Sequence, residues 1–249
     1  MGARSLPAVI AHRGSSLRAP ENTLAAFRRA VAEGAGVVEL DCRLARDGEL
    51  VVIHDGTLRR TGGIRARVRD LPGAALAAVD VGAWFSARHA GETIPLLATV
   101  LHDLPPSVGL MIELKSDPFR PRRALFVRRL ARLLHRHAGS RPVMVCSFDH
   151  RLLRLLAAQA PRLPLGALHL PVRDTGRRPS THRARFGARW FICSVAQLRV
   201  RMVRDARDAG MQTACYTVNT AAQLRRAVDA GVDAVITDDP AGILARLRA

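Results

Sequence analysis

Residues 36–42 have the sequence Gly-Val-Val-Glu-Leu-Asp-Cys, in which two carboxylates interrupt an apolar run. The run is typical of a β-strand, where alternate side chains point to one face, so Glu39 and Asp41 are expected to share a face. Two neighbouring carboxylates in an apolar strand cost free energy unless a cation or strong donors compensate them. A hard divalent metal ion would provide that compensation.

The next apolar run, residues 50–54, ends at a histidine and follows too soon for a crossover helix to intervene. We therefore expect it to return antiparallel, as the second strand of a hairpin. Asp47-Gly48 is a favoured two-residue turn. With those two residues as the loop, Asp41 faces His54, and the hairpin brings a histidine to the carboxylates.

Similar short apolar runs recur along the chain, and helical patterns alternate with them. Apart from the hairpin return, the predicted strands end near His12, Asp41, Lys115, Ser147, His169, Ser194, Val218 and Asp238. Eight β/α units predict an α/β fold, a single (β/α)8 TIM barrel over residues 1–249. A doubly wound open sheet is the alternative, but it needs a glycine-rich turn after the first strand, which residues 12–16 match poorly.

Two segments do not fit the simple alternation. Residues 56–93 are rich in turn signals and are predicted to form a small insertion after the second strand, packed over the mouth of the barrel. Residues 173–189 are predicted to form a basic loop. Among the helices, the first is expected to be capped by Asn22 or Thr23, and the helix after the insertion is expected to open at Ile94-Pro95.

The chain is strongly basic, with a net charge of +18 and a pI of about 11.6. Such a charge ordinarily indicates an anionic partner. However, the arginines are spread over the predicted helices, and we interpret most of them as solvated helix faces. A nucleic-acid-binding module is disfavoured further because aromatic residues make up only 4% of the chain, which leaves little for base stacking. We therefore expect no nucleic-acid partner.

The four cysteines fall in predicted strands without the spacing of a metal site. They are expected to be small buried apolar residues in a reducing compartment. The sequence shows no apolar run long enough for a transmembrane segment and no clear secretory signal. We therefore expect a cytoplasmic location, with weak contact to an anionic membrane as an additional partner.

Barrel enzymes place their chemistry at the carboxyl ends of the strands, where the candidate residues of this sequence fall. Glu39, Asp41 and Glu113 form a set of oxygen ligands suited to Mg²⁺ or Ca²⁺. His12 and His54 can serve as a general acid and a general base, because an unperturbed imidazole has a pKa near 6.5. The residues do not decide which histidine takes which role.

Two cations accompany this set, namely Arg13 and the single lysine, Lys115. A metal ion together with both cations fits an anion whose charge is spread over several oxygens, such as a phosphodiester in its transition state. A structural role is the alternative: Arg13 would pair with Glu39, Lys115 with Glu113, and His12 would be a satisfied core histidine.

These residues together resemble the glycerophosphodiester phosphodiesterase family, and the combination is far more specific than any single motif. The matching segments follow the family's order over nearly the whole chain: His12-Arg13-Gly14, Pro20-Glu21-Asn22-Thr23, Glu39-x-Asp41, Asp47-Gly48 leading to His54-Asp55, Glu113-x-Lys115, Ser147-Phe148, Tyr216-Thr217-Val218-Asn219, and Gly231-Val232-Asp233 to Thr237-Asp238. Tyr216 stands where the family usually has tryptophan, and Thr61-Gly62-Gly63 departs from the usual threonine pair.

The resemblance implies a (β/α)8 barrel that hydrolyses a small-molecule glycerophosphodiester, such as glycerophosphocholine, to glycerol 3-phosphate and an alcohol. It implies catalytic roles for His12 and His54, and phosphate contacts for Arg13 and Lys115. It also implies that the three carboxylates are metal ligands, and Tyr216 is expected in the pocket wall. The alternative is a lipid phosphodiesterase resembling lysophospholipase D or sphingomyelinase D, acting at a membrane surface. The leaving alcohol, the attacking hydroxyl and the oligomeric state stay open.

Overall fold

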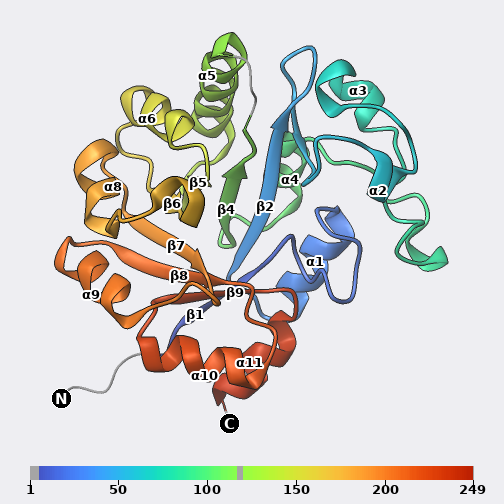
Figure 1. Ribbon diagram of the computed structural model, residues 1–249. Helices are drawn as coiled ribbons and strands as arrows, with labels where there is room; N and C mark the ends of the chain where they lie inside the picture. The colour runs from blue at the N-terminus through green and yellow to red at the C-terminus, as the bar shows by residue number, and fades with distance from the viewer. Residues whose placement is uncertain (1–5, 117–119, 249) are drawn as a thin grey trace.

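Eight parallel strands form a closed barrel at the centre of the computed structural model, which describes residues 6–116 and 120–248 (Figure 1). The barrel strands are β1 (Ala8–Ala11), β2 (Val37–Leu44), β4 (Gly109–Leu114), β5 (Val143–Ser147), β6 (Leu165–Leu168), β7 (Trp190–Ser194), β8 (Gln212–Tyr216) and β9 (Ala234–Thr237). The ring closes because β1 pairs in parallel with both β2 and β9. The predicted barrel is confirmed.

Helices alternate with the strands and surround them (Figure 1). They are α1 (Leu24–Ala32), α4 (Leu97–Asp103), α5 (Arg120–His137), α6 (His150–Gln159), α7 (Pro171–Asp174), α8 (Pro179–Phe186), α9 (Val200–Asp208), α10 (Ala221–Ala230) and α11 (Pro240–Arg248). Thr23 is the residue that caps α1, because its side chain accepts a hydrogen bond from the amide of Ala26. The helix after the insertion begins at Leu97, slightly later than predicted, since Leu96 has an extended backbone.

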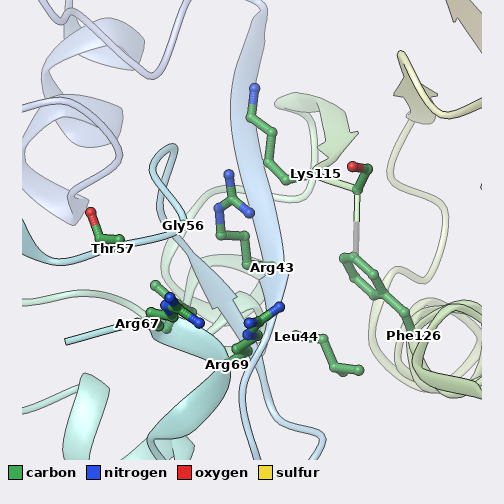
Figure 2. A pocket seen from close by; sticks show the side chains of 10 residues that line it. Arg43, Leu44, Gly56, Thr57, Arg67, Arg69, Lys115 and Phe126 are labelled. Carbon is green, nitrogen blue, oxygen red and sulfur yellow. The ribbon is translucent and has the colours of Figure 1, made fainter. Parts of the chain in front are cut away.

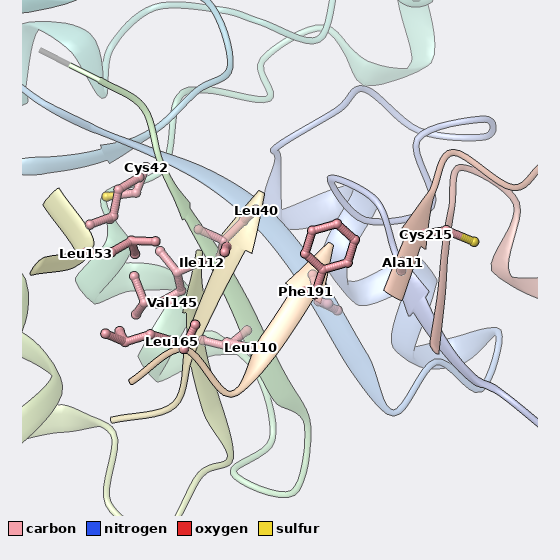
Figure 3. Close-up of a cluster of buried hydrophobic side chains, with 14 of the residues drawn as sticks. Ala11, Leu40, Cys42, Leu110, Ile112, Val145, Leu153, Leu165, Phe191 and Cys215 are labelled. Carbon is pink, nitrogen blue, oxygen red and sulfur yellow. The ribbon is translucent and has the colours of Figure 1, made fainter. Parts of the chain in front are cut away.

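Side chains along each strand alternate between two apolar layers. In β4, Leu110, Ile112 and Leu114 belong to the large cluster between the strands and the helices, part of which Figure 3 shows. Met111 instead belongs to a smaller cluster inside the barrel. Glu113 has the same parity as Met111 and therefore points to the interior side of the sheet, at the carboxyl end of β4.

A hairpin extends from β2, and its predicted register was wrong by one residue. β3 (Leu50–Val52) pairs antiparallel with β2, with Cys42 opposite Val52. The amide of Ile53 then donates to the carbonyl oxygen of Asp41, so Ile53 rather than His54 lies opposite Asp41. His54 comes immediately after this last pair.

The register differs because the hairpin loop has three residues, Arg46 to Gly48, instead of two. The amides of Gly48 and Glu49 fix this turn: Gly48 donates to the carbonyl of Ala45, and Glu49 donates to the side chain of Asp47. Gly48 has a φ of +88°, which glycine adopts without steric cost and which ends a three-residue hairpin loop.

Residues 56–93 contain only short helical turns: α2 (Arg59–Gly62), η1 (Val68–Asp70), α3 (Gly73–Leu76) and η2 (Ala87–His89). They bury their own apolar cluster, which includes Leu58 and Leu76 of the segment and Val51 and Ile53 of the hairpin. Figure 1 shows this segment beside β2. The segment is therefore anchored to the hairpin, and its assignment as an insertion over the barrel mouth stays a prediction.

The basic segment that was predicted as a loop over residues 173–189 is largely helical, and that prediction was wrong. It contains the end of α7 and all of α8, both of which have a proline in the first turn. Proline is common in the first turn of a helix. Its fixed φ suits the helix, and its missing N–H costs nothing there because the first amides have no intrahelical partner. Within the described residues, no helix combines the length and hydropathy needed to cross a membrane.

Candidate active site

Three carboxylates converge at the carboxyl ends of β2 and β4. The register places Asp41 directly beside Glu113 across the two parallel strands, and Glu39 lies one alternation earlier on the same face. A donor oxygen from each of the three lies within 4.8 Å of the others. Glu39 and Asp41 are only 3% and 1% exposed. The predicted acidic cluster therefore exists, and these two carboxylates are buried from solvent.

Burial and mutual repulsion disturb the acidity of this cluster. Burial, followed by the charge of Asp41, raises the pKa of Glu39 to about 8. Burial also raises the pKa of Glu113, even though Lys115 opposes it. Burial pushes the pKa of Asp41 the same way, but Lys115 and Arg13 outweigh it and hold that pKa well below its usual range. Ionisation of all three carboxylates would therefore place more negative charge here than Lys115 and Arg13 compensate.

The two predicted cations both lie against the carboxylates. Lys115 Nζ is 2.8 Å from Asp41 Oδ1 and 2.6 Å from Glu113 Oε1. Arg13 Nε is 3.1 Å from Asp41 Oδ2, and its Nη1 donates to Glu21 at 3.0 Å. The backbone of Arg13, with a φ of +57°, turns its amide to donate to Glu39 Oε2 at 2.9 Å.

Each of the two predicted histidines is held by an aspartate through Nδ1. His12 Nδ1 lies 2.6 Å from Asp238 Oδ1, and His54 Nδ1 lies 2.7 Å from Asp55 Oδ1. An aspartate at Nδ1 accepts a hydrogen bond from the N–H there, which orients the ring and leaves Nε2 on the other side of the ring without this partner. In both rings the aspartate contacts Nδ1 and not Nε2, which is the arrangement that the predicted acid and base roles require.

The two rings differ in their affinity for a proton. Burial disfavours the charged form of His12, but the hydrogen bond to Asp238 and the nearby Glu39 outweigh burial and raise its pKa. Burial lowers the pKa of His54. The charge of Asp41 would raise it, but Lys115 and Arg13 oppose that effect. Both imidazoles thus lie within electrostatic reach of the acidic cluster, and their pKa values move apart.

Several supporting residues were not assigned a role in the active site from the sequence. Asn22 donates from Nδ2 to Asp41 Oδ2 at 2.8 Å, and its Oδ1 accepts from the Asp41 amide. Asp238 also accepts from Asn219 Nδ2 at 2.7 Å. Asn22, Asn219 and Asp238 all belong to segments that match the family, so the sequence did single them out. Only the fold shows what they contact.

The wall around the site includes aromatic and basic side chains. Tyr216, whose place in the pocket wall stays a prediction, ends β8 and packs edge-to-face on Phe148 with ring centroids 6.4 Å apart. Beside the hairpin, a cavity of about 280 Å³ shares Lys115 with the acidic site and is also lined by Arg43 and Arg67 (Figure 2). Arginine side chains give this side of the site a positive surface.

The insertion is connected to the site by one arginine. Arg60 of α2 donates to both carboxylate oxygens of Glu21, which in turn accepts from Arg13. Arg60 also donates to Asp55, the partner of His54, and its guanidinium lies 5.9 Å from the ring centroid of Trp84. The insertion therefore helps to position both Arg13 and His54.

Comparison with known proteins accounts for this arrangement. The model of the glycerophosphoryl diester phosphodiesterase family matches residues 12–242. The chain belongs to this family. A glycerophosphodiester phosphodiesterase of Caldanaerobacter subterraneus subsp. tengcongensis is 34% identical over 245 residues, covering 96% of this chain and 97% of that protein. As a member of the family, the chain is a phosphoric diester hydrolase.

Two further relatives bear on substrates. The structure of an Oleispira antarctica phosphodiesterase in complex with sn-glycerol-3-phosphate has a TM-score of 0.90 and 29% identity, and the match covers 98% of each chain. A mouse lysophospholipase D is 26% identical, over 95% of this chain and 85% of that protein. Family members therefore include proteins named for water-soluble diesters and for a lipid.

Proposed function

We propose that this protein hydrolyses glycerophosphodiesters to glycerol 3-phosphate and an alcohol, with a divalent cation held by Glu39, Asp41 and Glu113. The observation that carries the proposal is the register of β2 and β4, which gathers three buried carboxylates within 4.8 Å. Family membership supports the reaction class, and the Oleispira complex with glycerol 3-phosphate supports the product.

The donor set fits Mg²⁺ or Ca²⁺ rather than zinc. All three predicted ligands are carboxylates, and hard cations prefer oxygen, whereas zinc favours nitrogen and sulfur. Burial and the charge of Asp41 raise the pKa of Glu39, and a divalent cation bound there would favour the ionised form. When bound, such a cation would polarise the phosphoryl oxygens and neutralise charge that develops on them.

The directions of the two histidine pKa shifts favour one assignment of their roles. The lowered pKa of His54 favours an unprotonated Nε2, so we assign it as the base that takes the proton of the attacking hydroxyl group. The raised pKa of His12 favours a protonated ring, so we assign it as the acid. As the new P–O bond forms and the P–O bond to the alcohol breaks, His12 gives its proton to the leaving oxygen.

Arg13 and Lys115 are proposed to contact the phosphate. Both sit on the acidic cluster, with their charges directed at Asp41. A cation bound by the carboxylates would compete for those same oxygens, so the guanidinium and ammonium groups would turn to the phosphate oxygens of the substrate. Glu21 keeps Arg13 in place for this, because it binds Nη1 independently of Asp41.

The deciding experiment measures release of glycerol 3-phosphate from glycerophosphocholine by the wild-type protein and by Glu113→Gln. We expect EDTA to abolish wild-type activity, added Mg²⁺ or Ca²⁺ to restore it, and the variant to need far more metal. Asp103→Asn, which removes a carboxylate from the surface ion pair with Arg28, is the matched control and should behave as the wild type. Activity that is indifferent to EDTA would overturn the proposed metal requirement.

A lipid substrate is the second candidate, and two observations favour it. Trp84 of the insertion is 45% exposed, and the mouse relative is named as a lysophospholipase D. Co-sedimentation with anionic vesicles at low and high salt tests this candidate, because a basic membrane-binding surface releases at high salt. Absence of binding at low salt would reject it.

A cytoplasmic location is also part of the proposal. Its support is that Cys42, Cys146, Cys193 and Cys215 are all buried free thiols. Free thiols persist in a reducing compartment, whereas oxidising compartments favour disulfides.

A further inference from the structure

A second group of ligand-type side chains lies at the carboxyl end of β6, which is separated from β4 by β5. His150 begins α6, His169 directly follows β6, Asp174 ends α7, and His182 lies within α8. We call these four residues the imidazole cluster. Asp174 is 2% and His182 is 1% exposed. The cluster is separate from the acidic site and has no role in the proposed hydrolysis.

The donor atoms of the imidazole cluster face one another. Ligand atoms of His150, Asp174 and His182 all lie within 4.8 Å of each other. His150 Nδ1 is 3.9 Å from Asp174 Oδ1, and His169 Nδ1 is 3.7 Å from Asp174 Oδ2. Donors bound to zinc at 2.0–2.1 Å are about 3.4 Å apart in a tetrahedron. Contraction of the distances among His150, Asp174 and His182 would give a metal-binding geometry, and His169, which lies outside this 4.8 Å group, would have to move further to complete it.

The hydrogen bonding of the histidines points to a ligand that is not a protein group. Among the described residues, His169 Nδ1 and His182 Nε2 are buried and have no hydrogen-bond partner. An unsatisfied buried polar atom is costly, and native structures have few of them. A core histidine that serves only packing would normally have such an atom bonded.

His150 shows the tautomer that a metal ligand needs. Its Nε2 lies 3.0 Å from the carbonyl oxygen of Leu168, so Nε2 carries the proton and donates it there. Nδ1 then has a free lone pair directed at Asp174. Metal-binding histidines commonly donate their other ring N–H to a backbone carbonyl in this way, which fixes the ring for coordination.

We propose that the imidazole cluster binds a first-row transition metal ion of the Zn²⁺ type, through His150, Asp174 and His182, with His169 as the fourth ligand. Three imidazoles and one carboxylate suit such an ion, whereas Mg²⁺ and Ca²⁺ prefer oxygen alone. Phe186 and Phe191 wall the cluster with apolar rings, at 6.0 and 6.4 Å from the His182 centroid.

Arg177 does not block the ion. Its Nη1 lies 3.4 Å from Asp174 Oδ1. That side chain is 44% exposed, so it is free to exchange this long contact for water. Asp174 is held independently, because its Oδ2 accepts from the amide of Leu170. A bound ion would tie α6, α7 and α8 to the end of β6.

The experiment adds Co²⁺ to protein that was stripped with a chelator and then saturated with Mg²⁺. Tetrahedral Co²⁺ with nitrogen ligands absorbs strongly in the visible, whereas an octahedral oxygen site absorbs weakly, so the spectrum reports this cluster selectively. We expect one equivalent of tightly bound, strongly absorbing Co²⁺, displaced by Zn²⁺. Absence of the intense bands in the wild-type protein would overturn the proposal.

Variants locate the ion. His182→Ala should abolish the bands, and His150→Gln, at a partly exposed position that tolerates change better, should weaken Co²⁺ binding by more than about tenfold. His135→Ala, which removes an exposed histidine of α5, is the matched control and should keep full binding. Full binding in a folded His150→Gln protein would contradict the assignment even if His182→Ala fails to fold. Glu113→Gln should keep the bands, which separates this result from that of the acidic site.

Discussion

The two ligand-type clusters of this barrel lie at the same end of the sheet and differ in what surrounds them. The acidic cluster of Glu39, Asp41 and Glu113 has oxygen donors only and is contacted by Arg13 and Lys115. The imidazole cluster has mainly nitrogen donors, two of them unpartnered among the described residues. The acidic cluster offers a cation negatively charged oxygens, whereas the imidazole cluster offers it mainly the lone pairs of neutral nitrogens.

The difference indicates how a single fold separates two kinds of cation. Carboxylates concentrate negative charge, which attracts a hard divalent ion. The same charge holds lysine and arginine beside the cluster, where they can contact an anionic substrate. Neutral imidazoles hold little charge and select an ion by the softness and geometry of their nitrogens. We therefore expect the acidic cluster to control the reaction, and the imidazole cluster to control local structure.

The largest expected effect comes from the two histidines beside the acidic cluster. His12→Ala and His54→Ala should each lower kcat by roughly 10²- to 10⁴-fold, because each removes a proton-transfer group. Steady-state hydrolysis of glycerophosphocholine at saturating Mg²⁺ measures the loss. His135→Ala serves as the control, since that histidine is exposed on α5. Near-wild-type turnover in both active-site variants would show that the acidic cluster works without these imidazoles.

A smaller effect is expected from a residue that only orients a ligand. Asn22 holds Asp41 through its side-chain amide, and such supporting partners typically change metal affinity by about 10- to 100-fold. Asn22→Ala should therefore raise the Mg²⁺ concentration needed for half-maximal activity by that factor. Turnover at saturating metal should fall less. A lower turnover with unchanged metal dependence would place Asn22 in substrate binding instead.

Most of the barrel and of the acidic cluster followed from the sequence because their signals are local. Alternation within β2 and β4 is enough to put Glu39, Asp41 and Glu113 on one side of the sheet. The hairpin register did not follow from the sequence. Asp47-Gly48 is compatible both with the predicted two-residue loop and with the observed three-residue loop, in which Gly48 has a positive φ.

The imidazole cluster could not be predicted for a different reason. Its four members come from α6, the residue after β6, α7 and α8, and their spacing in the sequence follows no motif. The segment that holds Asp174 and His182 was expected to be a loop, so no face could be assigned to it. Only the packing of α8 against α6 brings these side chains together.

A pH profile tests whether Asp238 acts on His12 through its charge. Asp238 raises the pKa of His12, so Asp238→Asn should lower that pKa and move the alkaline limb of kcat/KM to lower pH. The acid limb, which depends on His54, should stay in place. Asp55→Asn is the matched variant: it removes the group that favours protonated His54 and should move only the acid limb, also to lower pH. A uniform loss of activity at every pH would indicate a purely structural role for Asp238.

The smallest expected effect is on stability, and it has opposite signs with and without metal. In EDTA, Glu39→Gln should raise the free energy of unfolding by about 0.5–2 kcal/mol, because the folded wild-type protein must either keep Glu39 protonated or bury a third like charge, whereas glutamine is neutral at every pH. Burial and the charge of Asp41 raise the pKa of Glu39 from 4.5 to about 8, so the wild-type protein loses stability as the pH rises between these two values. The advantage of the variant should therefore grow from pH 6 to pH 9.

Saturating Mg²⁺ should reverse this order. The wild-type protein gains stability from every ion that binds its folded form, whereas the Glu39→Gln variant has lost a charged ligand and gains less. The new amide side chain would still accept a hydrogen bond from the backbone amide of Arg13 through its oxygen, so the variant keeps that contact. Urea unfolding at pH 6 and pH 9, with EDTA or Mg²⁺, measures all four conditions. If the variant is less stable than the wild type in EDTA, the Glu39 side chain stabilises the fold, and burial of its carboxylate is not its main effect on the free energy of unfolding.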